Sequence, residues 1–366
     1  MAVPDVNAHL HTPYSFSAFN GVPQALDMAA EEGVKVVGIN DFYSMDGYKE
    51  WSEECGARHL FPLFNIEFIS LNSEDQAAGL RVNDPNNPGR TYLSGKGLAY
   101  PVILSGEEAR QLAAVKAESN AQVEKMCGKL NAHLDAVKAG FNIDFRKVEA
   151  ELTRGSIRER HLAKAIRLAV DANVPSEDRP AFYERIFGGK QLKSAIDNLA
   201  AVENEIRGNL LKSGGAAFVP EDPKAFLPME TVCNILRAAG GIPTYPFLAD
   251  DAKGCFTDFE SDLQKAADTL KKRGINSVEF ITSRNTTEVL EKYASYLEDE
   301  GFIVTFGSEH NTPALEPIRL RTRNNTVLSE KLREINYRGA CAVAAHQAGY
   351  DSAAKGDELI QKTIAL

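Results

Sequence analysis

Continuous apolar runs alternate with helical patterns in the first part of the chain, and this alternation restricts the possible folds more than any other feature. The runs VKVVGI at 34–39 and LFPLFNIEFIS at 60–70 are apolar almost throughout. A helical pattern over 23–32, closed by Gly33, precedes the first run, and another over 48–56 separates the two. Strands that are apolar on both faces are typical of parallel sheets covered by helices. We therefore predict an α/β protein whose chemistry lies at the carboxyl ends of its strands.

The same alternation returns after a long helical segment. Residues 105–216 are rich in Ala, Glu and Lys, have helical apolar spacing and lack strand patterns. They are predicted to form a helical insertion between two barrel segments, 1–104 and 217–366. The later predicted elements are strands over 240–248, 275–282 and 301–311, and helices over 258–273 and 287–299. A length of 366 residues suits one α/β barrel with such an insertion.

Charge and cysteine content narrow the class of protein. The net charge of −10 argues against a general nucleic-acid-binding surface, so no nucleic-acid partner is expected. Five scattered cysteines without a Cys-x-x-Cys pair are typical of reduced thiols in the cytoplasm. The sequence has no signal-peptide pattern and no apolar run of membrane-spanning length. We therefore expect a soluble cytoplasmic protein with no membrane partner, and nothing in the sequence indicates its oligomeric state.

Two histidines separated by one residue, His9 and His11, lie on the first predicted strand. Residues i and i+2 of a strand share a face, so both imidazoles can reach one point, either as metal ligands or as a plain surface pair. Glu67 favours a metal site, because a buried strand rarely holds a carboxylate that is neither paired nor bound to metal. The other candidates that follow predicted strands are Asp41, Glu309 and His310. All of these groups are expected to converge at one end of a parallel barrel.

Five motifs then resemble one known superfamily. The segments HLHTPYSFS, GINDFYSMDGY, Glu67, GGIPTYP and FGSEHN, in this order, are similar to the polymerase-and-histidinol-phosphatase (PHP) superfamily. The resemblance covers roughly residues 1–75 and 238–315. It implies a distorted (β/α)7 TIM-like barrel of the PHP type, carrying a helical insertion. It also implies metal-dependent hydrolysis of phosphate esters, which the family performs with up to three metal ions.

Several metal-ligand positions of the family pattern are replaced in this chain. Phe42 stands where the second motif has a His, and Tyr245 replaces the His of the Ala-His-Pro motif. Glu309 and Asn311 replace the Asp and the last His of the final motif. The resemblance therefore implies one complete metal position, for a single Zn²⁺, Mn²⁺ or Fe²⁺ ion. Its expected ligands are His9, His11, Glu67 and Glu309.

Other residues are expected to assist this centre. Asp41 or His310 is expected to orient a ligand, carry a proton or help to hold a second ion. Arg90 and Lys96 are expected to bind a phosphate or carboxylate group of the substrate. They lie in the polar segment 83–98, interpreted as a loop that is either a substrate lid or a plain surface turn.

A second basic group lies at a predicted helix start within the insertion. It resembles the Arg/His-bearing helix start in the insertion of phosphatase-type relatives, and it is either an anion site or a solvated helix face. Its members are Arg158, Arg160 and His161.

Two functions remain open on these grounds. The first is a metal-dependent phosphoesterase with a reduced metal centre, acting on a small phosphorylated substrate. The second is a PHP-like barrel without turnover that binds a metabolite or a protein partner. The presence of bound transition metal separates the two.

Overall fold

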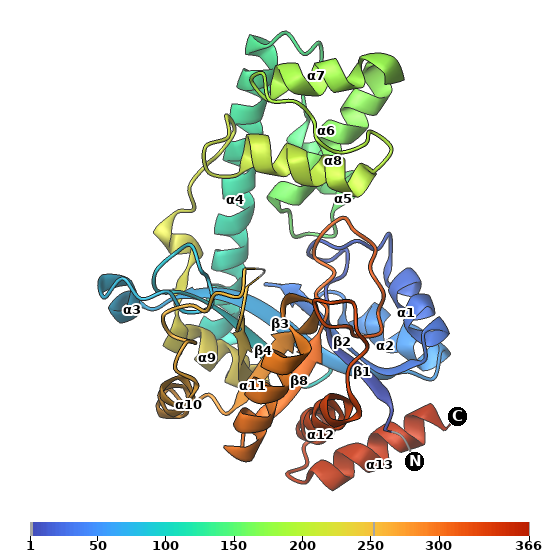
Figure 1. Cartoon of the computed structure of the whole chain (residues 1–366), viewed down its shortest axis with the longest axis vertical. Helices are drawn as coiled ribbons and strands as arrows, with labels where there is room; N and C mark the ends of the chain where they lie inside the picture. Colours follow the sequence, from blue (N-terminus) through green and yellow to red (C-terminus); the bar gives the residue numbers. More distant parts are fainter. Residues whose placement is uncertain (1–2, 252, 366) are drawn as a thin grey trace.

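The computed structural model describes residues 3–251 and 253–365. The predicted barrel segments begin at residue 1 and end at 366, so their outermost residues, and residue 252, lie outside the described part. Figure 1 shows a sheet flanked by helices in one half of the molecule and a cluster of helices above it in the other half.

Seven strands follow one another in a mixed sheet, in the order β1-β2-β3-β4-β6-β7-β8, with the two-residue β5 (Leu227–Pro228) beside β3. The seven strands are β1 (Asp5–Leu10), β2 (Val34–Phe42), β3 (Phe61–Leu71), β4 (Arg90–Lys96), β6 (Ile242–Phe247), β7 (Ser277–Ile281) and β8 (Ile303–Gly307). The first and last strands meet just beyond their ends, where the His11 amide donates to the Glu309 carbonyl over 2.8 Å. The sheet is therefore nearly closed, which confirms the predicted distorted TIM-like barrel.

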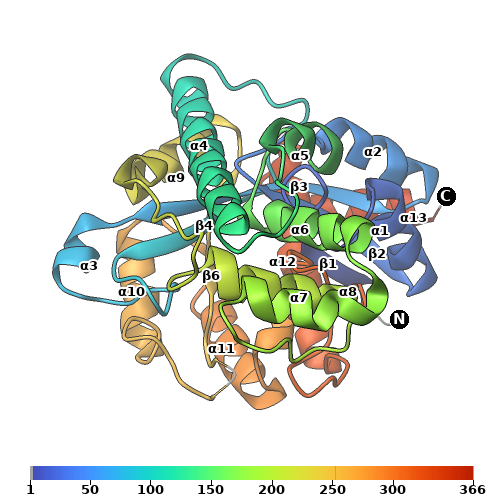
Figure 2. The same cartoon turned by 90° about the horizontal axis from the view of Figure 1, so that it is seen from above.

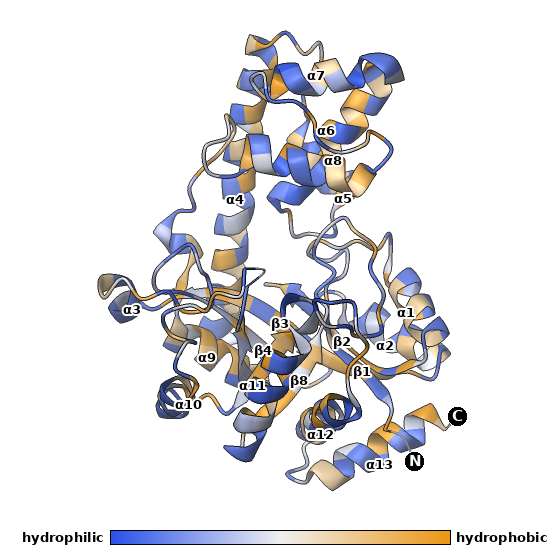
Figure 3. Cartoon of the chain, in the orientation of Figure 1, coloured by the Kyte–Doolittle hydropathy of each residue, from blue (hydrophilic) through white to orange (hydrophobic). Residues whose placement is uncertain are grey.

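Helices surround this sheet and bury one face each. They are α1 (Val22–Glu31), α2 (Tyr48–Ala57), α3 (Ser73–Ala77), α9 (Met229–Ala238), α10 (Leu263–Lys272), α11 (Thr287–Asp299), α12 (Glu330–Gln347) and α13 (Ala353–Ile364). In α1 the buried positions are Val22, Ala25, Leu26 and Ala29, which is the three-and-four spacing of one helix face. The mixed hydrophilic and hydrophobic colouring of the helices in Figure 3 agrees with this one-sided burial.

The expectation that 83–98 is a loop holds for 83–89 and is wrong for 90–96. Residues Arg90–Lys96 form β4, which runs antiparallel to both of its neighbours, β3 and β6. Along β4, Thr91 and Leu93 are buried, so the segment fills a strand position in the barrel wall despite its polar composition. Because β4 runs against its neighbours, its last residue, Lys96, pairs with Ile242, the first residue of β6.

The C-terminal segment forms the helices α12 and α13. Helix α12 packs against β1 and β8 and so covers the closing seam of the barrel. Gly339 of α12 lies so close to β8 that a Cβ there would stand 1.9 Å from the Val304 carbonyl oxygen. Helix α12 and the barrel seam therefore meet at a glycine.

This contact gives a testable result. Gly339→Ala is expected to lower the free energy of unfolding by about 1–3 kcal/mol, because the added methyl group forces α12 away from β8. Gly128→Ala is the matched control, since Gly128 also lies inside a helix but has nothing within 4 Å of the new Cβ. It is expected to leave stability unchanged or raise it by up to about 1 kcal/mol. Urea unfolding of both variants measures the difference, and equal stabilities would contradict the packing described.

Helices also make up the part of the chain predicted as an insertion. They are α4 (Gly106–Ala136), α5 (Phe145–Leu152), α6 (Glu159–Asn173), α7 (Arg179–Ile186), α8 (Leu199–Ile206) and the π-helical turn η2 (Arg207–Leu211). From Val123 onward they share a hydrophobic core separate from that of the barrel, whereas Val115 of α4 packs into the barrel core. Viewed from above, α6, α7 and α8 lie over one end of the sheet (Figure 2). Among the described residues, no helix is both long and apolar enough to cross a membrane.

Candidate metal centre

Three buried side chains meet inside the barrel at the carboxyl ends of its strands, here called the barrel mouth. His9 comes from β1, His11 lies just beyond it, and Glu67 comes from β3. The Nε2 atoms of the two histidines are 3.2 Å apart, and Glu67 Oε2 lies 3.2 Å from His11 Nε2 and 4.0 Å from His9 Nε2. The three ligand atoms lie within 4.8 Å of one another. The strand periodicity of His-x-His thus delivers both rings to one carboxylate.

The charge state of this cluster fits a divalent cation. Burial, together with the nearby Glu309 and Glu279 carboxylates, raises the pKa of Glu67 to about 8, although His9 opposes the shift. Burial also lowers the pKa of His11, which favours the neutral imidazole that metals bind. Glu67 Oε2 is buried and has no hydrogen-bond partner among the residues that the structure describes. Two imidazole nitrogens and an unsatisfied carboxylate oxygen are a suitable donor set for a divalent metal.

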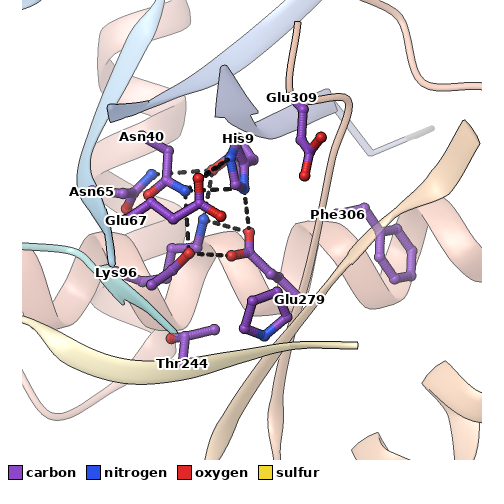
Figure 4. A network of polar contacts seen from close by, with 12 residues as sticks. His9, Asn40, Asn65, Glu67, Lys96, Thr244, Glu279, Phe306 and Glu309 are labelled. Carbon is purple, nitrogen blue, oxygen red and sulfur yellow. Dashed lines mark hydrogen bonds and ion pairs between the residues drawn. The ribbon is translucent and has the colours of Figure 1, made fainter. Parts of the chain in front are cut away.

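The buried ion pair of Lys96 and Glu279 contacts His9 through the Glu279 carboxylate. Glu279 of β7 lies 2.9 Å from His9 Nδ1 through Oε2, and the same oxygen lies 2.6 Å from Lys96 Nζ. Ser94 donates its hydroxyl to the other carboxylate oxygen of Glu279. Burial alone would raise the pKa of Glu279, but Lys96 and His9 outweigh it and hold that pKa well below its usual range. Figure 4 shows this network, with Lys96 and Glu279 on one side of His9 and Asn40 and Glu67 on the other.

Sequence reasoning named Lys96 but missed Glu279. Lys96 was expected to contact substrate phosphate, yet its ammonium group is enclosed within the barrel, where it also donates to the Ala8 carbonyl oxygen over 3.1 Å. Glu279 lies in the apolar strand SVEFI, so the rule that singled out Glu67 applies to it equally. The same buried-carboxylate signal could have found both residues.

Asp41 lies behind His11 rather than at the open side of the cluster. Its carboxylate accepts hydrogen bonds from the Thr12 amide (2.7 Å), the Thr12 hydroxyl (2.5 Å) and the Ser15 hydroxyl (2.5 Å). The Ser15 hydroxyl lies 3.1 Å from His11 Nδ1. Asp41 therefore fixes the turn that follows β1 and, through Ser15, the orientation of the His11 ring.

Glu309 and His310 follow β8 in left-handed backbone conformations, with φ of +65° and +57°. Figure 4 shows Glu309 beside the network without a contact to the other residues drawn. Its Oε2 is held by Arg284 at 2.7 Å and by Asn311 Nδ2 at 3.0 Å. His310 stacks on Phe19 and uses both ring nitrogens, at 2.8 Å from the Ser308 hydroxyl and 2.8 Å from a backbone carbonyl. The histidine thus anchors the loop that carries Glu309.

Two of the predicted phosphate-binding residues face the barrel mouth. The Arg158 guanidinium lies 4.5 Å from the centre of the Phe42 ring, and that ring stacks on His11 with centroids 5.2 Å apart. Among the described residues, no carboxylate forms an ion pair with Arg158. Arg160 lies over Phe16 and donates to Asn204 Oδ1 over 3.1 Å. The insertion thus brings two arginines to the open side of the cluster.

The remaining two candidates are engaged elsewhere. His161 accepts a hydrogen bond from the Arg158 amide through Nδ1 over 2.9 Å and so caps α6, and burial lowers its pKa to about 3. Arg90 pairs with Glu221 at 3.2 Å and lies over the Phe226 ring at 4.3 Å. The structure does not bring Arg90, Lys96 or His161 to the open side of the metal cluster.

A cavity of about 370 Å³ opens beside the centre, between the insertion and the loop after β8. Three arginines line it, Arg160 and Arg207 from the insertion and Arg284 from the short turn η4 (Thr282–Arg284). Glu309 and His310 form its wall on the side of the metal cluster. The cavity therefore joins a cationic surface to the candidate centre.

Tyr245, which stands where the resemblance led us to expect a histidine, does not reach the cluster. Its hydroxyl donates to Glu260 Oε1 over 2.7 Å, and the Glu260 carboxylate also accepts from the amides of Leu248 and Ala249. The aromatic ring thereby anchors the loop after β6 rather than a metal.

Comparison with known proteins gives a fold likeness. A scan of protein-family models finds no match to this sequence, and a search of curated proteins finds no similar sequence. Among solved structures, a proposed metal-dependent phosphoesterase from Bifidobacterium adolescentis superposes with a TM-score of 0.56 at 17% identity, covering 91% of this chain and 96% of that one. An amidohydrolase from Chromobacterium violaceum, solved with bound sulfate and no metal, gives a TM-score of 0.52 at 15% identity over 91% and 96% of the two chains. At these identities the likeness shows a shared fold.

Proposed function

We propose that this chain is a metal-dependent hydrolase of small phosphate esters and a divergent member of the PHP superfamily. The observation that carries the proposal is Glu67 Oε2, which is buried beside two imidazoles and lacks a hydrogen-bond partner in the described part of the chain. Arg158 lies over the Phe42 ring and forms no ion pair with a described carboxylate. The descriptions of the two structural neighbours, a metal-dependent phosphoesterase and a sulfate-bound amidohydrolase, agree with this chemistry.

The proposed centre holds one Zn²⁺, Mn²⁺ or Fe²⁺ ion. Its ligands are His9, His11 and Glu67, with Glu309 as the fourth. When bound, such an ion polarises a phosphoryl oxygen and lowers the pKa of a coordinated water.

The surrounding residues have separable roles in this proposal. Arg158 neutralises the phosphate at the open side, since a guanidinium matches phosphate geometry and no carboxylate of the described residues pairs with this one. Glu279 accepts from His9 Nδ1 and directs Nε2 toward the ion, as carboxylates commonly do for metal-bound histidines. Asp41 serves His11 in the same way through Ser15. His310 acts as a loop anchor, because both of its ring nitrogens have partners.

One observation favours the second function, a barrel without turnover. Tyr245, which stands where the resemblance places a metal-binding histidine, bonds to Glu260 instead of facing the metal position. A chain that has replaced such a ligand by an internal hydrogen bond retains the cavity as a binding site alone. Metal content and turnover decide between the two functions.

The test begins with protein purified without chelator. We expect about one equivalent of transition metal per chain and Mn²⁺-dependent release of phosphate from at least one member of a panel of phosphate monoesters and diesters. His11→Gln is expected to lose both the metal and the turnover, and a thermal melt establishes that the variant is folded. His346→Gln is the control, because His346 is exposed on α12. A metal-free wild-type protein that His11→Gln leaves unchanged in stability would favour the binding function instead.

A further inference from the structure

The fourth proposed ligand is held by an arginine. Arg284 Nη2 lies 2.7 Å from Glu309 Oε2, and the two side chains are 41% and 13% exposed. Asn311 donates to the same oxygen over 3.0 Å. The group of atoms within ligand distance of one another contains His9, His11 and Glu67 but not Glu309. The carboxylate of Glu309 therefore has partners that compete with the metal position.

The backbone keeps Glu309 next to that position all the same. Its carbonyl oxygen accepts from the His11 amide over 2.8 Å, and its amide donates to the His9 carbonyl over 3.0 Å. The next residue, His310, is fixed by the contacts of its ring nitrogens with the Ser308 hydroxyl and a backbone carbonyl. Because the backbone is fixed on both sides, the carboxylate can change partner only by rotating its own side chain between staggered conformations.

The cavity beside Arg284 carries more positive charge than its wall neutralises. Arg160 has Asn204 as its polar partner, and burial together with the adjacent Arg207 lowers the pKa of Arg160 to about 10. Arg207 in turn shares Glu159 with a lysine. An oxyanion in this cavity would meet Arg160 and Arg284 together, in a lining that holds three arginines against the two carboxylates of Glu309 and Glu316.

We propose that Arg284 is a latch on the metal centre. With no anion bound, Arg284 holds Glu309 away from the metal position. An oxyanion entering the cavity takes Arg284 as its partner and releases Glu309 to the cation. Binding of a divalent cation and binding of an oxyanion such as phosphate are therefore positively coupled. This inference rests on the proposed function, because it concerns the same metal centre.

The exchange replaces one charge-assisted contact of Arg284 by another. Solvent screens the Arg284–Glu309 pair on the side of the 41% exposed arginine, and the contact between Arg284 and the anion offsets the loss of the pair. Coupling between two ligands is reciprocal, so each must strengthen the other by the same factor. A factor of about fivefold, at the low end of known couplings, is expected here.

The experiment is a calorimetric titration of chelator-stripped protein with Mn²⁺, with and without inorganic phosphate. In wild-type protein, phosphate is expected to strengthen Mn²⁺ binding about fivefold or more. Arg284→Met is expected to bind Mn²⁺ about fivefold more tightly than wild type without phosphate, and phosphate then adds little. Glu309→Gln removes the shared carboxylate and is expected to bind Mn²⁺ weakly with no response to phosphate. Arg338→Met, which removes an exposed pair with Glu298, is the control and is expected to behave as wild type.

Two results would overturn the latch while leaving the metal centre in place. One is an Arg284→Met variant whose Mn²⁺ affinity equals that of wild type. The other is an undiminished phosphate effect in that variant, which would mean that phosphate strengthens Mn²⁺ binding without Arg284. Failure of the proposed function gives a different result, namely that His11→Gln binds Mn²⁺ as well as wild type does.

Discussion

Replacing Glu67 by glutamine is expected to remove the bound metal and to lower phosphate-ester turnover on the order of a thousandfold. The amide has the shape of the carboxylate, so the packing of β3 is retained. It lacks the negative charge that a divalent cation requires beside two neutral imidazoles. Because Glu67 Oε2 has no hydrogen-bond partner within 3–251 and 253–365, the substitution breaks no hydrogen bond at that atom there. The loss should therefore fall on metal binding rather than on stability.

Metal content by mass spectrometry and kcat/KM on the best ester of the panel measure this effect. Glu221→Gln is the matched control, since it makes the same chemical change at the ion pair with Arg90. That variant is expected to keep its metal and its rate within about twofold. A Glu67→Gln protein with wild-type metal content would rule out Glu67 as a ligand.

Glu279→Ala is expected to lower the free energy of unfolding by about 3–5 kcal/mol. The substitution leaves the Lys96 ammonium group buried with a single carbonyl contact, and an unpaired buried charge is costly. The Ser94 hydroxyl and His9 Nδ1 lose an acceptor in the same step. Chemical denaturation followed by circular dichroism measures the loss.

A double substitution separates charge burial from simple cavity formation. Glu279→Leu combined with Lys96→Met replaces the pair by apolar groups and is expected to recover most of the lost stability. Lys355→Ala, which removes an exposed ion pair with Glu358, is the control and should cost less than about 1 kcal/mol. If Glu279→Ala lowered the free energy of unfolding no more than this control does, the Lys96–Glu279 ion pair would not contribute to stability.

Local sequence pattern predicted the barrel and the heart of its site. Apolar runs located β2 and β3, and helical spacing located α1, α2 and α11 close to their observed limits. His9, His11 and Glu67 meet as expected, because strand periodicity and the common direction of parallel strands together fix where their side chains project.

The sequence pattern could not predict which side chains from distant strands and loops pair with one another. The short polar segment 90–96 forms β4 because its backbone groups pair with both β3 and β6. This pairing depends on distant strands, so the local sequence pattern does not reveal it. Its antiparallel direction carries Lys96 into the barrel interior, where it meets Glu279 rather than substrate. The same limit applies to Glu309, since its pairing with Arg284 depends on how the loops after β7 and β8 meet.

Helix α4 has a consequence for the architecture as a whole. One of its ends contributes Val115 to the barrel core, and the remainder forms a wall of the second core from Val123 onward. The helices of residues 105–216 therefore do not form a unit that packs independently of the barrel. Deleting residues 105–216 would expose apolar surface of the barrel core that α4 covers. It would also remove the two guanidinium groups that face the barrel mouth, those of Arg158 and Arg160. Helix α4 is thus a structural element that the barrel and the helical segment share.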